Sequence, residues 1–248
     1  MLLNQKITLQ GEVLFRRRGT YLSLIAVPIL IIAFYQYRHP FGGDPAGLIW
    51  TITCLAVSLT GLSLRIFTAG CRPRRTSGRN KKKGQVADAL NTSGAYSLTR
   101  NPLYLANFIV ILGVVMYFFL WWLVVMYALA FWLYYERIIM AEENFLKNKF
   151  GDEYIQWAET TPVFFPAFRN WRPPVLPFSW KTALKAEYQT LSLTVVVFIA
   201  LEVVSHFRTG QNFLAEPAWI GLMAVTLIFF TTVRYIHKRT RFLRVPGR

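Results

Sequence analysis

The chain has 248 residues, of which 54% are hydrophobic, 16% aromatic and 16% charged. Charged residues are too few for a typical soluble protein of this length, so each long apolar run is tested first as a membrane span. The net charge of +16 would suggest nucleic-acid binding in a soluble protein, but membrane proteins collect Lys and Arg in their cytoplasmic loops. Composition therefore favours an integral membrane protein and argues against nucleic acid as a partner.

The cysteines and histidines do not have the spacing of metal ligands. Cys54 lies in an apolar run and Cys71 lies beside a basic loop, while His39, His206 and His237 are far apart in the sequence. Metal sites and disulfide frameworks are recognised by clusters of such residues. We therefore expect neither a metal site nor a disulfide framework.

The amino-terminal part predicts two membrane spans. Residues 1–18 are polar and end in three arginines, and no small-residue cleavage pattern follows, which argues against a removable signal peptide. The run from Tyr21 to Tyr37 is uncharged and about 17 residues long, enough to cross a thin hydrocarbon core. A loop rich in Pro and Gly separates it from a second span, Ala46 to Leu64.

Arg65 follows directly after the second span and has two interpretations. Its long side chain could reach the membrane interface, which is common at the end of a span. Alternatively, it could face an anion in a cavity and thereby bind substrate. The sequence leaves both open.

The hydrophilic connection from Cys71 to Asn91 sets the orientation of the chain. It carries seven Lys or Arg residues, and such loops lie on the cytoplasmic side and attract anionic lipid head groups. Residues 16–18 fall on the same side after two spans, and so does the basic tail from Arg234 to Arg248 if the number of spans is even. Both termini are therefore expected to be cytoplasmic.

The run from Leu103 to Tyr135 predicts a helical hairpin. Its roughly 33 uncharged residues would make one helix of about 50 Å, far longer than the hydrocarbon core of about 30 Å. No charged loop interrupts the run, so we expect two helices joined by a tight turn near Tyr117 to Trp122. This hairpin would bring Arg100 and the segment around Glu142 to the same face of the membrane.

Both ends of the hairpin carry polar residues that suit a binding site. Asn101 is a good helix N-cap and Pro102 suits the first helical position, where free N–H groups can hold an anion. Beyond the hairpin, an amphipathic helix contains Glu142 and Glu143. Glu143 could simply pair with Lys147 one turn later, whereas Glu142 is followed at that step by a leucine and is a candidate for binding hydroxyls or a cation.

The ordered motifs between Ser93 and Phe168 resemble the isoprenylcysteine carboxyl methyltransferase and phospholipid methyltransferase group of membrane enzymes. The group has Arg-His-Pro-x-Tyr-x-Gly, then Glu-Glu-x-x-Leu, then Phe-Gly-x-x-Tyr. The corresponding residues are Arg100-Asn101-Pro102-Leu103-Tyr104-Leu105, then Glu142-Glu143-Asn144-Phe145-Leu146, then Phe150-Gly151-Asp152-Glu153-Tyr154. Two residues depart from the pattern: Asn101 replaces His, which weakens any role for an imidazole base, and Ala106 replaces Gly.

The resemblance implies S-adenosylmethionine as the cofactor and methyl transfer to a lipid-like acceptor. It also implies that Glu142 and Glu143 contact the cofactor. We assign the candidate residues as follows: catalytic, Arg100 and Glu142; cofactor-binding, Tyr96, Asn101, Tyr104, Leu105, Glu142 and Glu143; substrate-binding, Arg65 and Arg137. The acceptor remains open between an isoprenoid or fatty carboxylate, a phospholipid amine and a lipid phosphate.

The carboxyl-terminal part predicts an interfacial linker and two more spans. The linker runs from Asn170 to Phe178, and the spans run from Leu191 to His206 and from Pro217 to Val233. Glu202 in the first of them either has a function inside the membrane or simply reaches water near the outer end. The two spans would shape an acceptor pocket or form the surface of a homodimer.

The sequence thus predicts an all-α, polytopic membrane bundle of about six transmembrane helices in three parts. Residues 1–92 hold two spans and the basic loop, 93–168 the methyltransferase-like core, and 169–248 the linker and the last two spans. The motifs look bacterial, so we expect a multi-pass protein of the bacterial inner membrane. Two other functions stay open: an NADPH-dependent membrane sterol or lipid reductase, and a non-catalytic lipid-binding scaffold.

Overall fold

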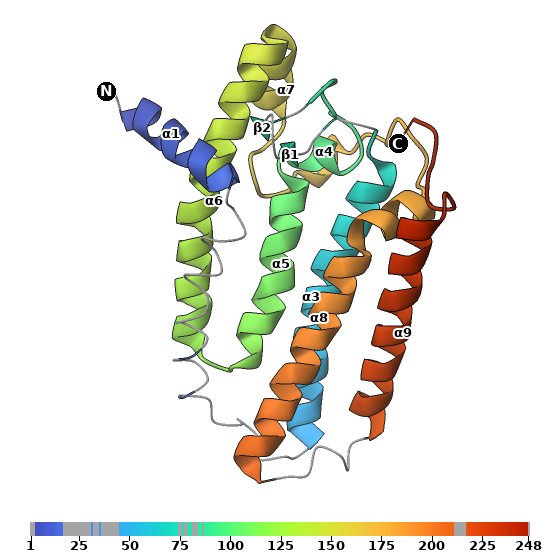
Figure 1. Ribbon diagram of the computed structural model, residues 1–248. Coiled ribbons are helices and arrows are strands. Elements are labelled where there is room, and N and C mark those ends of the chain that lie inside the picture. Colours follow the sequence, from blue (N-terminus) through green and yellow to red (C-terminus); the bar gives the residue numbers. More distant parts are fainter. Residues whose placement is uncertain are drawn as a thin grey trace.

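The computed structural model describes residues 3–16, 31, 35, 45–73, 76, 79–80, 84–85, 87–210 and 217–247. Its regular structure is almost entirely helical (Figure 1). The helices are α1 (Leu3–Arg16), α3 (Pro45–Cys71), α4 (Ala95–Leu98), α5 (Pro102–Tyr117), α6 (Trp121–Phe150), α7 (Asp152–Thr160), the 3₁₀ helix η1 (Phe168–Asn170), α8 (Trp180–Thr209) and α9 (Pro217–Arg239). Two short antiparallel strands, β1 (Arg79–Asn80) and β2 (Gly84–Gln85), lie in the basic connection.

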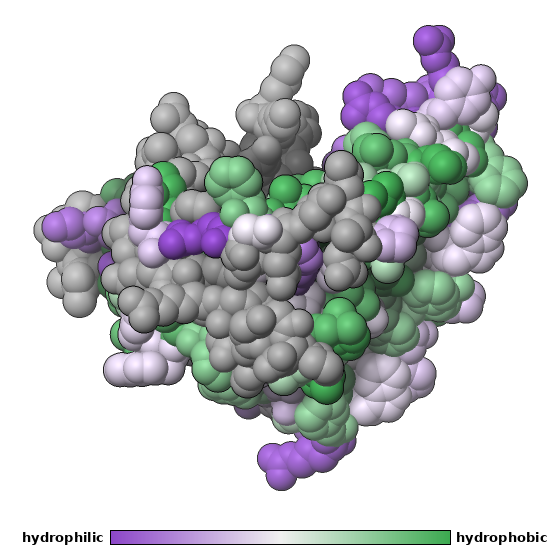
Figure 2. Space-filling model, turned by 90° about the horizontal axis from the view of Figure 1, so that it is seen from below, coloured by the Kyte–Doolittle hydropathy of each residue, from purple (hydrophilic) through white to green (hydrophobic). Residues whose placement is uncertain are grey.

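The prediction of a polytopic helical membrane bundle is confirmed. Within the described residues, four helices, α3, α6, α8 and α9, are long and apolar enough to cross a membrane, and α5 is a shorter apolar helix. Figure 2, which views the bundle from below, shows hydrophobic side chains over much of its coloured surface. The predicted first span, Tyr21 to Tyr37, lies outside the described residues apart from two isolated positions, so the total of six stays a prediction.

The predicted helical hairpin is present. Helix α5 ends at Tyr117 and α6 begins at Trp121, so three residues make the turn. Phe119 in this turn has a φ of 53°, a backbone conformation that non-glycine residues seldom adopt. The turn of the hairpin lies toward the lower end of Figure 1, while α4 and α7 lie at the opposite end, here called the α4/α7 end. Helix α1 and the residues after α9 also lie toward the α4/α7 end.

Close packing of α3 against α5 fixes the hairpin on the rest of the bundle. A Cβ on Gly113 would lie 2.3 Å from the backbone oxygen of Cys54, and one on Gly61 would lie 2.6 Å from the backbone nitrogen of Val110. The Ser58 hydroxyl donates to the Val110 carbonyl across the same interface, at 2.7 Å. The two backbones can approach this closely only because the glycines have no side chain.

Helix α8 begins at Trp180, eleven residues before the predicted start of this span. It packs along α3 and α9. Glu202 near its other end is buried, with 6% of the residue exposed, and accepts hydrogen bonds from the Thr51 and Tyr117 hydroxyls at 2.8 and 3.1 Å. The interpretation that Glu202 reaches water is therefore wrong: its carboxylate links α8 to α3 and α5.

Candidate functional site

Two segments that are distant in sequence lie side by side at the α4/α7 end. The backbone N–H of Arg100 donates to the Pro162 carbonyl at 2.9 Å, and that of Ala167 donates to the Leu98 carbonyl at 2.9 Å. These bonds hold the residues just before α5 against the chain that follows α7. The start of α5 is therefore anchored by backbone hydrogen bonds, which hold Arg100 in place.

Asn101 fixes this junction but does not cap α5 as predicted. Helix α5 does begin at Pro102, yet the Asn101 side chain makes no capping hydrogen bond. Its Nδ2 donates instead to the Val163 carbonyl at 3.0 Å, and the Thr99 hydroxyl donates to the same oxygen at 3.1 Å. The capping prediction was wrong because the carbonyl of a distant residue competes for the amide.

An ion pair joins the two predicted motifs. Nη1 of Arg100 lies 2.8 Å from Oε1 of Glu143, and the two side chains are 15% and 29% exposed. Tyr154, from α7, hydrogen-bonds with the side chains of both residues. Burial, and next the charge of Glu143, raise the pKa of the Tyr154 phenol to about 12. This phenol therefore remains protonated at neutral pH and can donate to the carboxylate.

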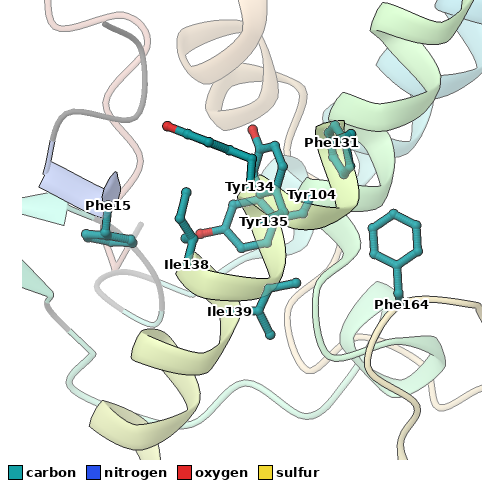
Figure 3. Close-up of a cluster of buried hydrophobic side chains, with 8 residues drawn as sticks. All are labelled: Phe15, Tyr104, Phe131, Tyr134, Tyr135, Ile138, Ile139 and Phe164. Carbon is teal, nitrogen blue, oxygen red and sulfur yellow. The ribbon is translucent and has the colours of Figure 1, made fainter. Parts of the chain in front are cut away.

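The neighbouring glutamate has a different partner. The Tyr104 hydroxyl donates to Oε2 of Glu142 at 2.8 Å, so the predicted residues at and just before the start of α5 meet those of α6 at two points. Tyr104 also belongs to a buried aromatic cluster (Figure 3), in which its ring lies 4.8 Å from that of Tyr135 and the Phe131 and Tyr135 rings stack at 4.1 Å. Tyr104 thus connects the charged group to an apolar interior.

Arg100, Tyr104, Glu142, Glu143 and Tyr154 are here called the charged group. Several buried polar atoms in or next to it have no hydrogen-bond partner among the described residues. They are Nε of Arg100, Nε1 of Trp157 and Oε1 of Glu143, the last of which is close to Arg100 without the alignment of a hydrogen bond. The Trp157 ring lies 5.7 Å from that of Tyr154, so these atoms belong to one neighbourhood. Buried polar atoms are nearly always paired in proteins. The two donors therefore lack the partner that buried polar atoms usually have, whereas Oε1 of Glu143 has the charge of Arg100 beside it.

Arg65 lies apart from this group. Its Nε and Nη2 donate to the two carboxylate oxygens of Glu187 at 2.8 and 3.0 Å, and its Nη1 donates to Oδ1 of Asn107. Its guanidinium therefore neither extends alone to the interface nor waits for an anion, because it ties α3 to α8 and α5. Its predicted role in binding substrate has no support in these contacts.

The remaining predicted residues lie around the group. Arg137 faces α1, where its Nε donates to Oε1 of Gln10 at 3.3 Å. Tyr96 is half-buried in α4, and Leu105 packs against the aromatic cluster. The structure thus gathers Arg100, Glu142, Glu143 and Tyr104, while Arg65 and Arg137 make other contacts.

Sequence reasoning missed three participants. Tyr154 belongs to the third motif, but its spacing gave no role, and Trp157 follows it by three residues, on the same face of a helix. Glu187, the partner of Arg65, lies nine residues after the linker, in the polar start of α8, which the sequence did not predict to be helical. A search for aromatic residues one turn beyond the motif would have found Trp157.

No group of three or more His, Cys, Asp or Glu side chains that could hold a metal ion occurs in the described part of the chain.

No solved structure matches the chain. Two curated proteins are similar to it. The nickel-cobalt-cadmium resistance protein NccN of Alcaligenes xylosoxydans xylosoxydans is 33% identical over 138 residues, which are 54% of this chain and 64% of that protein. The cobalt-zinc-cadmium resistance protein CzcN of Cupriavidus metallidurans is 36% identical over 121 residues, which are 49% of this chain and 54% of that protein.

The chain therefore spans less than two thirds of the length of either relative. The sequence model of the phospholipid methyltransferase family matches residues 78–153. This range contains Arg100, Tyr104, Glu142 and Glu143, and it agrees with the resemblance that the ordered motifs indicated. Residues 78–153 of this chain are thus similar in sequence to the phospholipid methyltransferase family.

Proposed function

We propose that this chain is an integral membrane methyltransferase that transfers a methyl group from S-adenosylmethionine to a lipid-like acceptor at the cytoplasmic face of the membrane. One observation supports this most directly: the Arg100–Glu143 ion pair, 2.8 Å long, lies within the segment that matches the family. Next to it, Tyr104 reaches from an aromatic cluster to Glu142. Charged side chains beside an apolar aromatic cluster suit a reaction between a polar cofactor and a lipid.

The open polar atoms of the site suit S-adenosylmethionine. Arg100 and Trp157 offer donors to a carboxylate, and such charge-assisted hydrogen bonds are strong. Glu143 and Glu142 offer acceptors to an ammonium group or a ribose hydroxyl. When bound, the cofactor supplies an electrophilic methyl group on a sulfonium. An anchored arginine and two consecutive carboxylates of α6 thus match the charges of its amino-acid end.

The residues of the chain act mainly by positioning. Methyl transfer is a displacement that is accelerated when two reactants are held in line. The backbone bonds that fix Arg100 against Pro162 and the neutral Tyr154 phenol beside Glu143 restrict the motion of the binding group. An acceptor that is already an anion needs no general base, so the replacement of the family's His by Asn101 is compatible with transfer to a carboxylate or phosphate.

A labelled-methyl assay tests this proposal. Purified full-length protein is incubated with methyl-labelled S-adenosylmethionine and a total bacterial membrane lipid extract, and label is counted in the organic phase. We expect label that depends on the protein and that falls at least tenfold in an Arg100→Lys variant, because lysine keeps the charge but loses the fork geometry. An absence of transfer by folded protein to any lipid fraction would contradict the proposal.

A control with NADPH distinguishes methyl transfer from the main alternative function, that of an NADPH-dependent reductase. A membrane sterol or lipid reductase should oxidise NADPH in the presence of the same extract, and a scaffold should neither oxidise NADPH nor transfer methyl groups. The absorbance of NADPH at constant protein concentration distinguishes these outcomes. We expect no oxidation above the rate without protein.

A further inference from the structure

A second candidate site lies outside the segment that matches the family. A pocket of about 230 Å³ opens between α3, α8 and α9. Its walls are almost wholly apolar and include Ile66, Phe178, Leu184 and Phe229. At roughly 30 Å³ for each water-sized group, this volume holds about eight non-hydrogen atoms. The pocket is therefore large enough for a segment of one hydrocarbon chain.

The carboxylate of Glu187 in the pocket wall is neutralised by an arginine of the same chain. Glu187 lines the pocket, and both of its oxygens accept hydrogen bonds from Arg65 at 2.8 and 3.0 Å. A bidentate pair of this kind satisfies both charges. Among the described residues that line it, the pocket thus has no unpaired charge, so an apolar chain would not meet an unpaired ion from them.

Basic groups lie close to the same pocket, next to its aromatic walls. Lys181 follows the pocket residue Trp180, and its Nζ lies 4.4 Å from the ring centre of Phe242. The guanidinium of Arg234 lies 5.8 Å from the Phe230 ring, which in turn lies 5.7 Å from the ring of the pocket residue Tyr188. No Asp or Glu occurs between residues 217 and 248. This end of α8 and α9 is thus strongly cationic.

A histidine beside the pocket has an open ring nitrogen. The His237 ring lies 5.9 Å from that of Tyr188, and its buried Nδ1 has no hydrogen-bond partner among the described residues. A buried nitrogen of this kind favours a ligand that supplies a donor or an acceptor. His237 thus lies beside the pocket residue Tyr188, and Lys181 follows the pocket residue Trp180. Arg234 lies beside Phe230, whose ring is next to that of Tyr188.

We propose that this pocket binds one hydrocarbon chain of an anionic membrane lipid, whose head group lies against Lys181, Arg234 and His237. A lipid is the occupant that the surroundings supply, because just 11% of the apolar window of α9 is buried within the bundle. Positive side chains at a membrane surface attract anionic head groups. Lipid binding at this site does not depend on methyl transfer, so the two proposals can be tested independently.

Native mass spectrometry of the detergent-purified full chain tests the proposal with phosphatidylglycerol and phosphatidylcholine of identical acyl chains. Ala183 is buried in the pocket wall, so Ala183→Phe should fill the cavity, whereas Ala200→Phe changes an exposed position on the same helix. We expect the wild type to hold the anionic lipid at least tenfold more tightly than the neutral one. Ala183→Phe should lose at least tenfold of that affinity and Ala200→Phe none.

A second variant keeps the test decisive if Ala183→Phe does not fold. Lys181→Gln with Arg234→Gln leaves the pocket walls intact and should reduce the affinity for phosphatidylglycerol to that for phosphatidylcholine. Equal affinity of the wild type for both lipids, or unchanged affinity in folded Ala183→Phe, would overturn the proposal. Binding of phosphatidylglycerol by protein that does not bind S-adenosylmethionine would contradict the proposed function but would still support this lipid site.

Discussion

Two adjacent glutamates of α6 have different partners, and this division defines the candidate site at the residue scale. Glu143 faces Arg100 and Tyr154, whereas Glu142 accepts a hydrogen bond from Tyr104. Successive residues of a helix point about 100° apart, so a consecutive pair can reach two neighbours at once. Glu143 thus belongs to the charged group and Glu142 to its boundary with the aromatic cluster.

Substitution of the two glutamates should therefore have unequal effects. Glu143→Gln removes the countercharge of Arg100, and hydrogen bonds to charged groups contribute roughly 1.5–3 kcal/mol. We expect the affinity for S-adenosylmethionine to fall by at least about tenfold, as measured by calorimetry. Glu142→Gln keeps an acceptor for the Tyr104 hydroxyl and should cost less. An equal loss in both variants would contradict this division of roles.

Substitution of Tyr104 offers a separate test of the contact between Glu142 and the aromatic cluster. Tyr104→Phe removes the hydroxyl that donates to Glu142 and keeps the ring in the aromatic cluster. We expect a loss of about 0.5–3 kcal/mol in stability, the range for a hydrogen bond to a neutral or charged group. Tyr104→Ala also empties the ring position and should cost about 3–5 kcal/mol. Thermal unfolding in one detergent compares the two variants with the wild type.

The sequence predicted which polar residues approach one another but not all of their bonds. Arg100 and Glu143 meet because a hairpin returns both of its ends to one face, which the length of the apolar run required. The bond of Asn101 to Val163 and the presence of Trp157 depend on how the chain after α7 folds back. No periodicity or spacing in a single sequence encodes those tertiary contacts.

At the scale of the element, glycines set the distance between α3 and α5. A Cβ at Gly113 would lie 2.3 Å from both the Cys54 carbonyl oxygen and the Ser58 hydroxyl oxygen. Backbone atoms cannot swing aside as a side chain can, so the two helices would have to separate. The position of Arg100 at the start of α5 depends on this close contact.

Gly113→Ala should therefore destabilise the bundle. Overpacking of this kind typically costs about 1–3 kcal/mol, and we expect a lower melting temperature in detergent. Gly221→Ala is the matched control, because a Cβ on Gly221 meets nothing within 4 Å. In a helix, alanine is favoured over glycine by roughly 1 kcal/mol, so this control should be neutral or stabilising. A melting temperature of Gly113→Ala at or above that of the wild type would refute the close contact.

Glu202 links three elements at the end of the bundle opposite the candidate site. Glu202→Leu removes the acceptor of the Thr51 and Tyr117 hydroxyls, and each lost buried hydrogen bond costs about 1–3 kcal/mol. We expect a lower melting temperature but an unchanged affinity for S-adenosylmethionine in the folded fraction. Glu202→Gln keeps an acceptor oxygen and should be milder. A selective loss of cofactor affinity would instead place Glu202 in the functional machinery.

The elements themselves were more predictable than their ends. The hairpin and its turn followed from about 33 uncharged residues that exceed the membrane thickness. The early start of α8 did not, because Lys181, Lys185 and Glu187 make its first turns look like a loop. Glu187 is tolerated in the helix since Arg65 neutralises it, a contact that depends on the fold.

At the scale of the whole molecule, the described parts place α4, α7 and the basic end of α9 toward one end of the bundle and the hairpin turn at the other (Figure 1). The basic residues at the end of α9 thus lie toward the same end of the bundle as the candidate site. If that end faces the cytoplasm, as positive residues usually do, the cofactor and the basic groups share a compartment. An acceptor lipid of the inner leaflet would then be within reach.

Cysteine labelling in intact cells tests this orientation. Arg244→Cys places a thiol at an exposed position after α9, and Trp121→Cys places one at the hairpin turn, where the native side chain is 79% exposed. The native Cys54 and Cys71 are buried and provide a low background. We expect an impermeant maleimide to label Trp121→Cys in intact cells and Arg244→Cys after permeabilisation. The reverse pattern would invert the proposed topology.

Calorimetric binding of S-adenosylmethionine to the purified protein tests the central claim most directly. The wild type is compared with the Glu142→Gln, Glu143→Gln double variant and with Glu159→Gln, which changes an exposed glutamate of α7. The account predicts micromolar affinity in the wild type and in Glu159→Gln, and loss of binding in the double variant. Folded wild-type protein that binds NADPH, or that binds neither compound, would contradict it.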